Sequence, residues 1–276
     1  MAVKMLTYQE KSSSIHQLTG ATKLLCFVMW SFATMVTYDT RILFLLFVVS
    51  IFVFRLSKVE WQEVSFVLLF IVFFLFINHI AIYLFSPQEG AMIYGTKHVL
   101  LEGVGRYQLT AEQLFYQFNI TLKYLTVIPA ALLFIVTTHP SEFASSLHRI
   151  GVNYRIAYAV SIALRYIPDV QKDYITIARA QQARGLDLSR KEKLPKRIKN
   201  AIAIIIPLIF SSLERIETVS NVMDLRGFGK KKNRTWYSSR PFQRRDYIAL
   251  LLVGGLLILS LSVTFYDGNR FFNPFL

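Results

Sequence analysis

Five stretches of the chain carry almost no charged side chains, and polar segments separate them. They cover residues 24–38, 42–54, 64–85, 111–136 and 247–265. A helix needs roughly 20 apolar residues to cross the hydrocarbon layer of a bilayer. The last three stretches meet this requirement and the first two are marginal, so the pattern predicts about five membrane-spanning helices. The 23 residues before the first stretch are polar and lack a small-residue cleavage site, so we expect that span to be retained.

Local signals mark two helix boundaries. The first two stretches are separated only by Asp39, Thr40 and Arg41. So short a break predicts a tight helical hairpin. Thr110 is followed three residues later by Gln113, a spacing that resembles a capping box and places the start of the fourth helix near Thr110. The predicted fold class is therefore an all-α membrane protein with about five transmembrane helices and a long region of amphipathic helices.

Residues 137–246 form a polar region that is too long for a plain loop. It opens with Pro140 in the first turn of a predicted helix, where Glu142 lies beside the positive end of the helix dipole. Two segments inside it repeat one design: an apolar stretch, a proline, an amphipathic helix and a terminal Arg-Gly pair. The prolines are Pro168 and Pro207, and the pairs are Arg184-Gly185 and Arg226-Gly227.

The two amphipathic helices are predicted to begin at their prolines. The spacing from proline to arginine is 16 residues in the first and 19 in the second, so the helices would be about 22 and 27 Å long. The apolar run 201–210 is too short for a span, and Pro207 is expected to split it. Apolar residues line one side of each helix: Val170, Tyr174, Ile177 and Ala178 in the first, and Ile209, Leu213, Ile216, Val219 and Met223 in the second.

Composition adds a second region to the membrane bundle. Hydrophobic residues make up 54% of the chain and charged residues 17%, which excludes an ordinary soluble globule. The net charge of +14, from 31 Lys and Arg against 17 Asp and Glu, is unusual for a protein that lies wholly within the bilayer. A membrane bundle joined to a strongly cationic region outside the membrane accounts for both values.

The distribution of the cations predicts the orientation of the chain. Residues 139–247 hold 21 Lys and Arg against nine Asp and Glu, a balance of +12, whereas residues 86–119 have a balance of −1. Because basic residues accumulate on the cytoplasmic side, we expect 139–247 in the cytoplasm and 86–119 outside. Five spans then place the N-terminus inside and the C-terminus outside.

Few residues suggest chemistry of their own. The single cysteine, Cys26, excludes an intramolecular disulfide and a cysteine-rich metal site. No phosphate-binding loop, nucleophile elbow or carboxylate pair is recognisable, so no catalytic, cofactor-binding or metal-binding residue is predicted. Asn78 and His79 lie inside a span. Two interpretations stay open: they line a translocation path, or they form hydrogen bonds with a neighbouring helix. The basic run 230–234 precedes the last span. In this position we expect it to anchor the chain to anionic lipid and not to bind nucleic acid.

Each Arg-Gly pair has two interpretations. A glycine after a helix enters the left-handed conformation at little cost, and an arginine in the last turn complements the helix dipole, so a single pair is an ordinary helix end. Two copies that end two similar segments suggest a second role. An arginine beyond a helix tip can offer its planar fork of donors to a carboxylate on another protein.

The chain resembles the transmembrane T-component of energy-coupling factor transporters, a class of prokaryotic importers of vitamins and metals. The likeness covers most of the chain, and the paired Arg-Gly motifs are its specific part. The other matching runs are Ile15-His16-Gln17-Leu18, Lys23-Leu24-Leu25, Thr137-Thr138-His139-Pro140-Ser141-Glu142 and Ser161 to Pro168. Two positions depart from the family pattern: Leu225 replaces a residue that is often smaller, and Thr19-Gly20-Ala21-Thr22 replaces an Asp-Pro turn.

The resemblance implies a non-enzymatic coupling subunit of an ATP-driven importer. In the family the two motifs end coupling helices that dock into grooves on two ABC-type ATPase subunits. The T-component links these ATPases to a membrane-embedded substrate-binding S-component, which takes up a vitamin or another micronutrient. The implied ATPase-binding residues are Ala183, Arg184, Gly185, Leu225, Arg226 and Gly227. No cofactor and no nucleic acid are implied, and the expected location is the prokaryotic plasma membrane, with the lipid bilayer as a further partner.

The expected organisation has three parts. A membrane bundle covers residues 1–136, a cytoplasmic coupling domain 137–246, and a last transmembrane helix with its tail 247–276. Three other functions stay open. A permease of a conventional ABC importer would carry one Glu-Ala-Ala-type cytoplasmic loop, which is not recognisable. A membrane enzyme would rely on His139 and His148 without a visible acid/base set, and a stand-alone substrate-binding protein would not need the large cationic region.

Overall fold

The computed structural model describes residues 13–103, 105, 107–186, 193–230, 235–237, 239–266 and 270–275, without the side chains of residues 61–63. The chain divides into two compact units, Met1–Glu142 with Arg240–Leu276 and Phe143–Ser239. The first unit holds the most apolar helices, and the second holds two long amphipathic helices.

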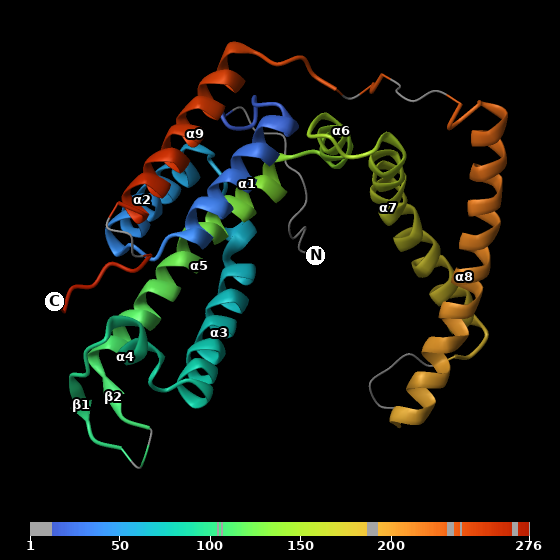
Figure 1. Ribbon diagram of the computed structural model, residues 1–276. Helices are drawn as coiled ribbons and strands as arrows, with labels where there is room; N and C mark the ends of the chain where they lie inside the picture. Colours follow the sequence, from blue (N-terminus) through green and yellow to red (C-terminus); the bar gives the residue numbers. More distant parts are fainter. Residues whose placement is uncertain are drawn as a thin grey trace. The chain divides into compact units, whose positions relative to one another are not determined.

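The first unit contains the five helices predicted as spans. They are α1 (Gly20–Val36), α2 (Thr40–Leu56), α3 (Trp61–Phe85), α5 (Ala111–Thr137) and α9 (Arg244–Thr264) (Figure 1). Within the described residues, α3, α5 and α9 are long and apolar enough to cross a membrane. Helices α1 and α2 have 17 residues each, about 26 Å, which is slightly less than the hydrocarbon layer. The predicted class, an all-α membrane protein, is confirmed.

Side-chain caps explain why α2 and α5 begin where they do. Asp39 accepts a hydrogen bond from the N–H of Arg41 (2.9 Å), and Thr110 accepts one from the N–H of Gln113 (3.2 Å). The tight hairpin and the helix start at Thr110 are therefore confirmed. The other half of the predicted capping box is not formed, because the Gln113 side chain accepts from the N–H of Gly90 instead (2.8 Å).

Helices α1, α2 and α5 meet at one carbonyl group. The Thr126 oxygen of α5 accepts hydrogen bonds from the Trp30 indole of α1 (3.3 Å) and the Ser50 hydroxyl of α2 (3.0 Å). Pro129 lies in the next turn of α5, and its missing N–H leaves the Leu125 carbonyl, one residue before Thr126, without its donor within the helix. The apolar core of the unit surrounds the contact and includes Trp30, Ala33, Ile42 and Leu46.

The starts of α1 and α9 lie beside the end of α5. The Lys23 ammonium donates to the Thr137 carbonyl (2.7 Å), and the N–H of Thr19 donates to the Asp246 carboxylate (2.9 Å). Thr19 also caps α1 by accepting from the N–H of Thr22. The chain thus enters its first helix through a normal cap, although it lacks the family's usual Asp-Pro turn.

The segment between α3 and α5 contains short elements where only a loop was predicted. It folds into α4 (Glu89–Tyr94) and an antiparallel pair, β1 (Val99–Leu101) with β2 (Leu109–Thr110). The buried carboxylate of Glu112 holds the pair on α5 through the backbone N–H (3.0 Å) and ring nitrogen (2.7 Å) of His98. Elements of two to six residues are too short to show a hydrophobic period, so the sequence offers no signal for them.

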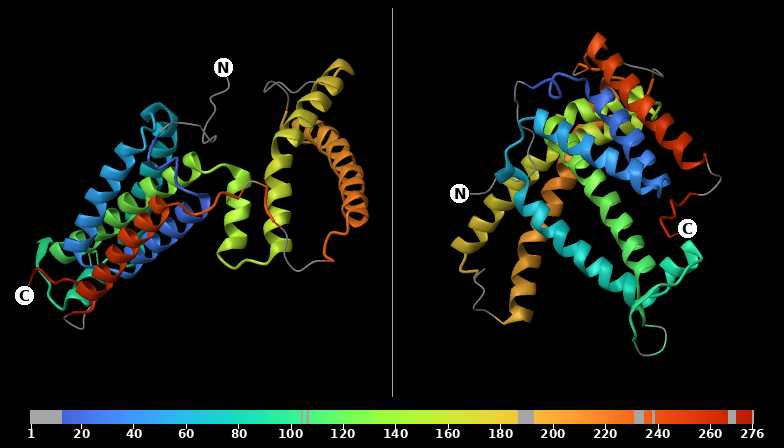
Figure 2. Two further views of the ribbon diagram at one scale, coloured as in Figure 1. Left: turned by 90° about the horizontal axis from the view of Figure 1, so that it is seen from above. Right: turned by 90° about the vertical axis from the view of Figure 1, so that its left-hand side faces the viewer.

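The second unit is dominated by two helices that cross. The helix α6 (Pro140–Arg149), which begins at the predicted proline, leads into α7 (Tyr154–Ala183) and α8 (Leu194–Leu225). The two helices cross in the view of Figure 1, and Figure 2 shows the pair from two further sides. They run in opposite directions, because Gln181 near the end of α7 bonds to Ala203 near the start of α8.

The prediction that the two helices begin at Pro168 and Pro207 is wrong. Both prolines lie inside continuous helices of 30 and 32 residues, which are about 45 and 48 Å long. An internal proline removes the hydrogen bond to the carbonyl four residues earlier. For Pro207 that carbonyl belongs to Ala203, and the side-chain amide of Gln181 donates to it (3.3 Å). Packing between the helices supplies the donor that the proline lacks, and Pro207 therefore does not split the run 201–210.

Candidate functional site

The first Arg-Gly pair terminates α7 in a Schellman motif. Arg184 is the C-cap residue, and Gly185 follows with φ of +86°. The N–H of Gly185 donates to the Gln182 carbonyl (2.9 Å), and the N–H of Leu186 donates to the Gln181 carbonyl (3.1 Å). This is the six-to-one and five-to-two pattern that closes a helix with a left-handed residue.

The second pair terminates α8 in the same way. Arg226 is the C-cap residue, and Gly227 has φ of +64°. The N–H of Gly227 donates to the Asp224 carbonyl (2.9 Å), and the N–H of Phe228 donates to the Met223 carbonyl (2.9 Å). The sequence repeat therefore corresponds to two helix ends with the same backbone geometry.

A third helix end shows that this geometry does not require arginine. After α6, Gly151 has φ of +102°, and the N–H of Val152 donates to the Leu147 carbonyl (3.0 Å). The residue before this glycine is Ile150. At all three ends glycine adopts the left-handed backbone conformation that closes the helix. Arginine precedes it at the ends of α7 and α8 but not after α6. The cap itself therefore does not explain the two arginines.

The structure brings the three residues of each motif together and keeps the two motifs apart. All three residues of the α7 motif are exposed: Ala183, Arg184 and Gly185. In the α8 motif Leu225 and Arg226 are exposed and Gly227 is half-buried. Because Gln181 lies beside Ala203, the tip of α7 lies near the start of α8, about 35 Å along α8 from Arg226. Leu225 is 88% exposed, so the larger side chain at this position extends into solvent and does not crowd the tip.

An aromatic cluster supports the α8 tip, and sequence reasoning missed it. The Phe228 ring lies 4.8 Å from that of Tyr158 and 5.8 Å from that of Tyr154, between ring centroids. Trp236 lies 6.1 Å from Tyr158. Phe228 follows the glycine of the Schellman motif, where an apolar residue commonly packs back on its helix. That position was the available signal.

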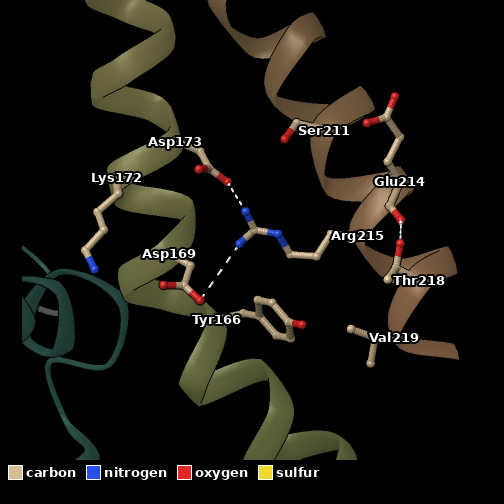
Figure 3. A pocket seen from close by; sticks show the side chains of 9 residues that line it. All are labelled: Tyr166, Asp169, Lys172, Asp173, Ser211, Glu214, Arg215, Thr218 and Val219. Carbon is tan, nitrogen blue, oxygen red and sulfur yellow. Dashed lines mark hydrogen bonds and ion pairs between the residues drawn. The ribbon is translucent and has the colours of Figure 1, made fainter. Parts of the chain in front are cut away.

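Ion pairs connect α7 and α8 where they cross (Figure 3). Arg215 of α8 lies 2.8 Å from the Asp173 carboxylate and 3.8 Å from that of Asp169, both on α7. The Arg215 guanidinium also lies 5.6 Å from the centre of the Tyr166 ring. These side chains are partly exposed, so each pair contributes about 0–1 kcal/mol. Their planar geometry fixes which turn of α7 faces which turn of α8.

Two grooves of the α7–α8 pair, one polar and one apolar, adjoin Arg215. The polar groove is the one drawn in Figure 3, with Asp169, Lys172, Asp173 and Glu214 in its lining. The apolar groove is lined by Ala159, Ile162, Ala163, Val170, Ile216 and Met223, together with residues shared with the polar groove. The apolar stripes predicted from helical spacing thus contribute to one surface made from both helices.

One of the two polar residues inside the third predicted span, His79, forms a contact between helices. His79 of α3 lies 2.8 Å from the Thr121 hydroxyl and 3.2 Å from the Gln117 carbonyl, both on α5. This favours the hydrogen-bond interpretation of His79 over a translocation path. The histidines considered for an enzyme make local contacts: His139 with Ser141 (2.6 Å) and His148 with the Val152 carbonyl (3.2 Å). Over the described part of the chain, no group of three His, Cys, Asp or Glu residues is placed to hold a metal ion.

Comparison with known proteins identifies the family. The model of the CbiQ family, described as cobalt transport protein, matches residues 11–237. An energy-coupling factor transporter transmembrane protein EcfT from Staphylococcus aureus is 24% identical over 270 residues, which is 95% of this chain and 96% of that protein. The EcfT protein of Streptococcus thermophilus is 27% identical over 91% of this chain and 95% of its own length. The EcfT protein of Leuconostoc gelidum is 29% identical over 61% of this chain and 66% of its own length. The chain therefore belongs to the CbiQ family as a transmembrane T-component of energy-coupling factor transporters.

Proposed function

We propose that this T-component couples two cytoplasmic ABC-type ATPases to a membrane-embedded S-component that takes up a vitamin or another micronutrient. The observation that carries the proposal is the pair of identical Schellman tips, each with an exposed arginine, at opposite ends of the α7–α8 pair. One ATPase would dock on Arg184 and the other on Arg226. The full set of docking residues is Ala183, Arg184, Gly185, Leu225, Arg226 and Gly227.

The chemistry of the tips suits a carboxylate-bearing groove. A guanidinium presents donors in a rigid fork that matches a carboxylate in two parallel hydrogen bonds. The glycine after each arginine has no side chain, so the partner's backbone can approach the tip closely. A separation of about 35 Å between the tips leaves each ATPase its own tip.

The crossing of α7 and α8 would transmit the motion. When the ATPases close on ATP or open after hydrolysis, they move the two tips, and the two continuous helices carry this displacement to the crossing. The ion pairs of Arg215 with Asp169 and Asp173 keep the helices in register there. The apolar groove lined by Val170, Ile216 and their neighbours offers a surface against which an apolar S-component could rest.

We assign no catalytic role to the chain itself, and hydrolysis of ATP would belong to its partners. The cationic region 139–247 would face the cytoplasm, where the ATPases are, and residues 86–119 would face outward. In sequence, the proposed coupling domain of residues 137–246 comes after the bundle of residues 1–136 and before the last transmembrane helix with its tail, residues 247–276.

Purification of the chain from its native membrane in mild detergent tests this assignment. We expect two ATPase subunits and a small hydrophobic membrane protein to co-purify in stoichiometric amounts. The isolated chain should hydrolyse no ATP, and the assembled complex should do so. A chain that purifies alone, or that retains turnover by itself through extensive purification, would contradict the proposal.

A further inference from the structure

The first half of α8 combines basic and apolar residues without any acid. Between Lys193 and Leu213 the chain has four cations and no Asp or Glu, and the first acid is Glu214. The cations are Lys193, Lys196, Arg197 and Lys199, all of which are exposed. Elsewhere on the pair, acids accompany the cations, as Asp169 and Asp173 do near Lys172. We refer to residues 193–210 as the basic apolar segment.

An exposed apolar stripe runs along this segment. Its members occur at spacings of three and four residues, so they fall within an arc of about 80° on the helix. They are Leu194, Ile198, Ile202, Ile205 and Ile209, with exposed fractions between 47% and 68%. This is far more apolar surface than single exposed residues on an ordinary protein surface provide.

The stripe is not the surface that packs on α7. Asn200 and Ile204 are the buried residues of α8, and Ala203 receives the hydrogen bond from Gln181. At 100° per residue these positions point away from the middle of the stripe. The pairing of α7 with α8 therefore does not account for the exposed isoleucines.

A groove borders the stripe on the side toward α7. Tyr174 of α7 forms one wall, and Leu194, Arg197, Ile198 and Ile205 of α8 contribute to its lining. The Tyr174 side chain is 47% exposed. A groove whose lining is mostly apolar and also holds a guanidinium and a phenol is suited to a molecule with an apolar chain and an anionic head.

We propose that the basic apolar segment binds anionic phospholipid at the membrane surface. Amphipathic helices that lie in the interface place an apolar stripe at the headgroup boundary and use Lys and Arg beside it to attract anionic lipid. Each such cation near an anionic surface favours binding by roughly fivefold. No Asp or Glu within residues 193–210 opposes this attraction, and Glu192 directly precedes the segment. This lipid site is distinct from the ATPase-binding tips and does not depend on them.

Site-specific quenching in nanodiscs tests the proposal with the full chain. After Cys26→Ser, a single environment-sensitive fluorophore is attached at Ile202→Cys, and at Thr218→Cys as a control on the polar side of α8. Each labelled protein is placed in phosphatidylcholine alone or in phosphatidylcholine with 30% phosphatidylglycerol, with either lipid brominated as the quencher. We expect brominated phosphatidylglycerol to quench the label at residue 202 more strongly, per mole, than brominated phosphatidylcholine, and to leave the label at 218 unaffected.

Charge variants then decide whether the cations cause the preference. Arg197→Gln with Lys199→Gln should reduce the preference for phosphatidylglycerol at residue 202 by about tenfold or more, since two cations are lost. High salt should act in the same direction. The matched control, Lys172→Gln with Arg179→Gln on α7, should leave it unchanged. Equal quenching by the two lipids would overturn the proposal, and so would an absence of quenching, which would leave the stripe to a protein partner.

Discussion

Glycine is needed at positions 185 and 227 because the backbone there is left-handed. Their φ angles of +86° and +64° lie in the left-handed region, where a side chain costs roughly 1–2 kcal/mol. Space is not the constraint, since a Cβ on Gly185 would meet nothing within 4 Å and one on Gly227 would meet the flexible Lys230 side chain at 3.2 Å. The arginines beside them are exposed and carry no such constraint, so the two residues of each pair have separate roles.

This separation predicts different effects for the two kinds of substitution. Gly185→Ala and Gly227→Ala should each lower the free energy of unfolding of the second unit by about 1 kcal/mol, because alanine is strained at positive φ. Arg184→Ala and Arg226→Ala should leave it nearly unchanged, as surface changes do. Hydrogen exchange of the α7 and α8 amides in detergent would measure both.

Gly254→Ala is the matched control for the glycine variants. Gly254 lies inside α9, and a Cβ there would meet nothing within 4 Å, so alanine should be neutral or stabilising. If Gly185→Ala were as well tolerated as Gly254→Ala, the tip would not need its left-handed residue, and the account of the cap would be wrong.

At the scale of elements, local signals set the helix starts and packing decided where the helices continue. The caps at Asp39 and Thr110 and the start at Pro140 were readable because each depends on a few adjacent residues. The continuation of α8 through Pro207 was not readable, because the donor that replaces its N–H is Gln181 on another helix. The Arg-Gly repeat located both tips, whereas the aromatic cluster around Phe228 joins Phe228 to residues 70 or more positions earlier and has no local pattern.

The pairing of Gln181 with the carbonyl freed by Pro207 can be tested by a double-mutant cycle. Gln181→Ala should cost about 1 kcal/mol, since it leaves the Ala203 carbonyl without its side-chain donor. In a Pro207→Ala background the helix regains its own N–H for that carbonyl, so Gln181→Ala should cost little. Hydrogen exchange around residues 201–210 would report both. Equal costs in the two backgrounds would show that Gln181 acts independently of the proline.

At the scale of the whole molecule, the two structural units differ in composition. The first unit supplies three helices that can span a membrane by length and composition, and the second supplies the two tips. The charge balances of +12 for residues 139–247 and −1 for residues 86–119 predict that the former faces the cytoplasm. Docking of cytoplasmic ATPases at Arg184 and Arg226 requires this orientation.

Cysteine labelling in intact cells checks the orientation. In a Cys26→Ser background, Glu102→Cys should react with a membrane-impermeant maleimide added from outside, because residues 86–119 are predicted to face outward. Thr218→Cys, which is exposed on α8, should react only after the cells are opened. Ser189, which the charge pattern also predicts on the cytoplasmic side, lies outside the described residues. Labelling of Thr218→Cys from outside would contradict the predicted topology.

The central claim is that the two arginine tips hold the two ATPases, and charge reversal tests it most directly. The measurement is ATPase retention in a pull-down, with substrate uptake, for Arg184→Glu, Arg226→Glu and the double variant. Arg165→Glu with Arg179→Glu, at exposed positions of α7, is the control with the same change of charge as the double variant. Reversing a charge at a desolvated contact costs roughly 2–5 kcal/mol. Each single variant should therefore weaken ATPase retention at least tenfold, the double variant should abolish retention and uptake, and the control should behave as wild type. A double variant that inserts normally, holds both ATPases and transports at the wild-type rate would show that the tips are ordinary helix ends.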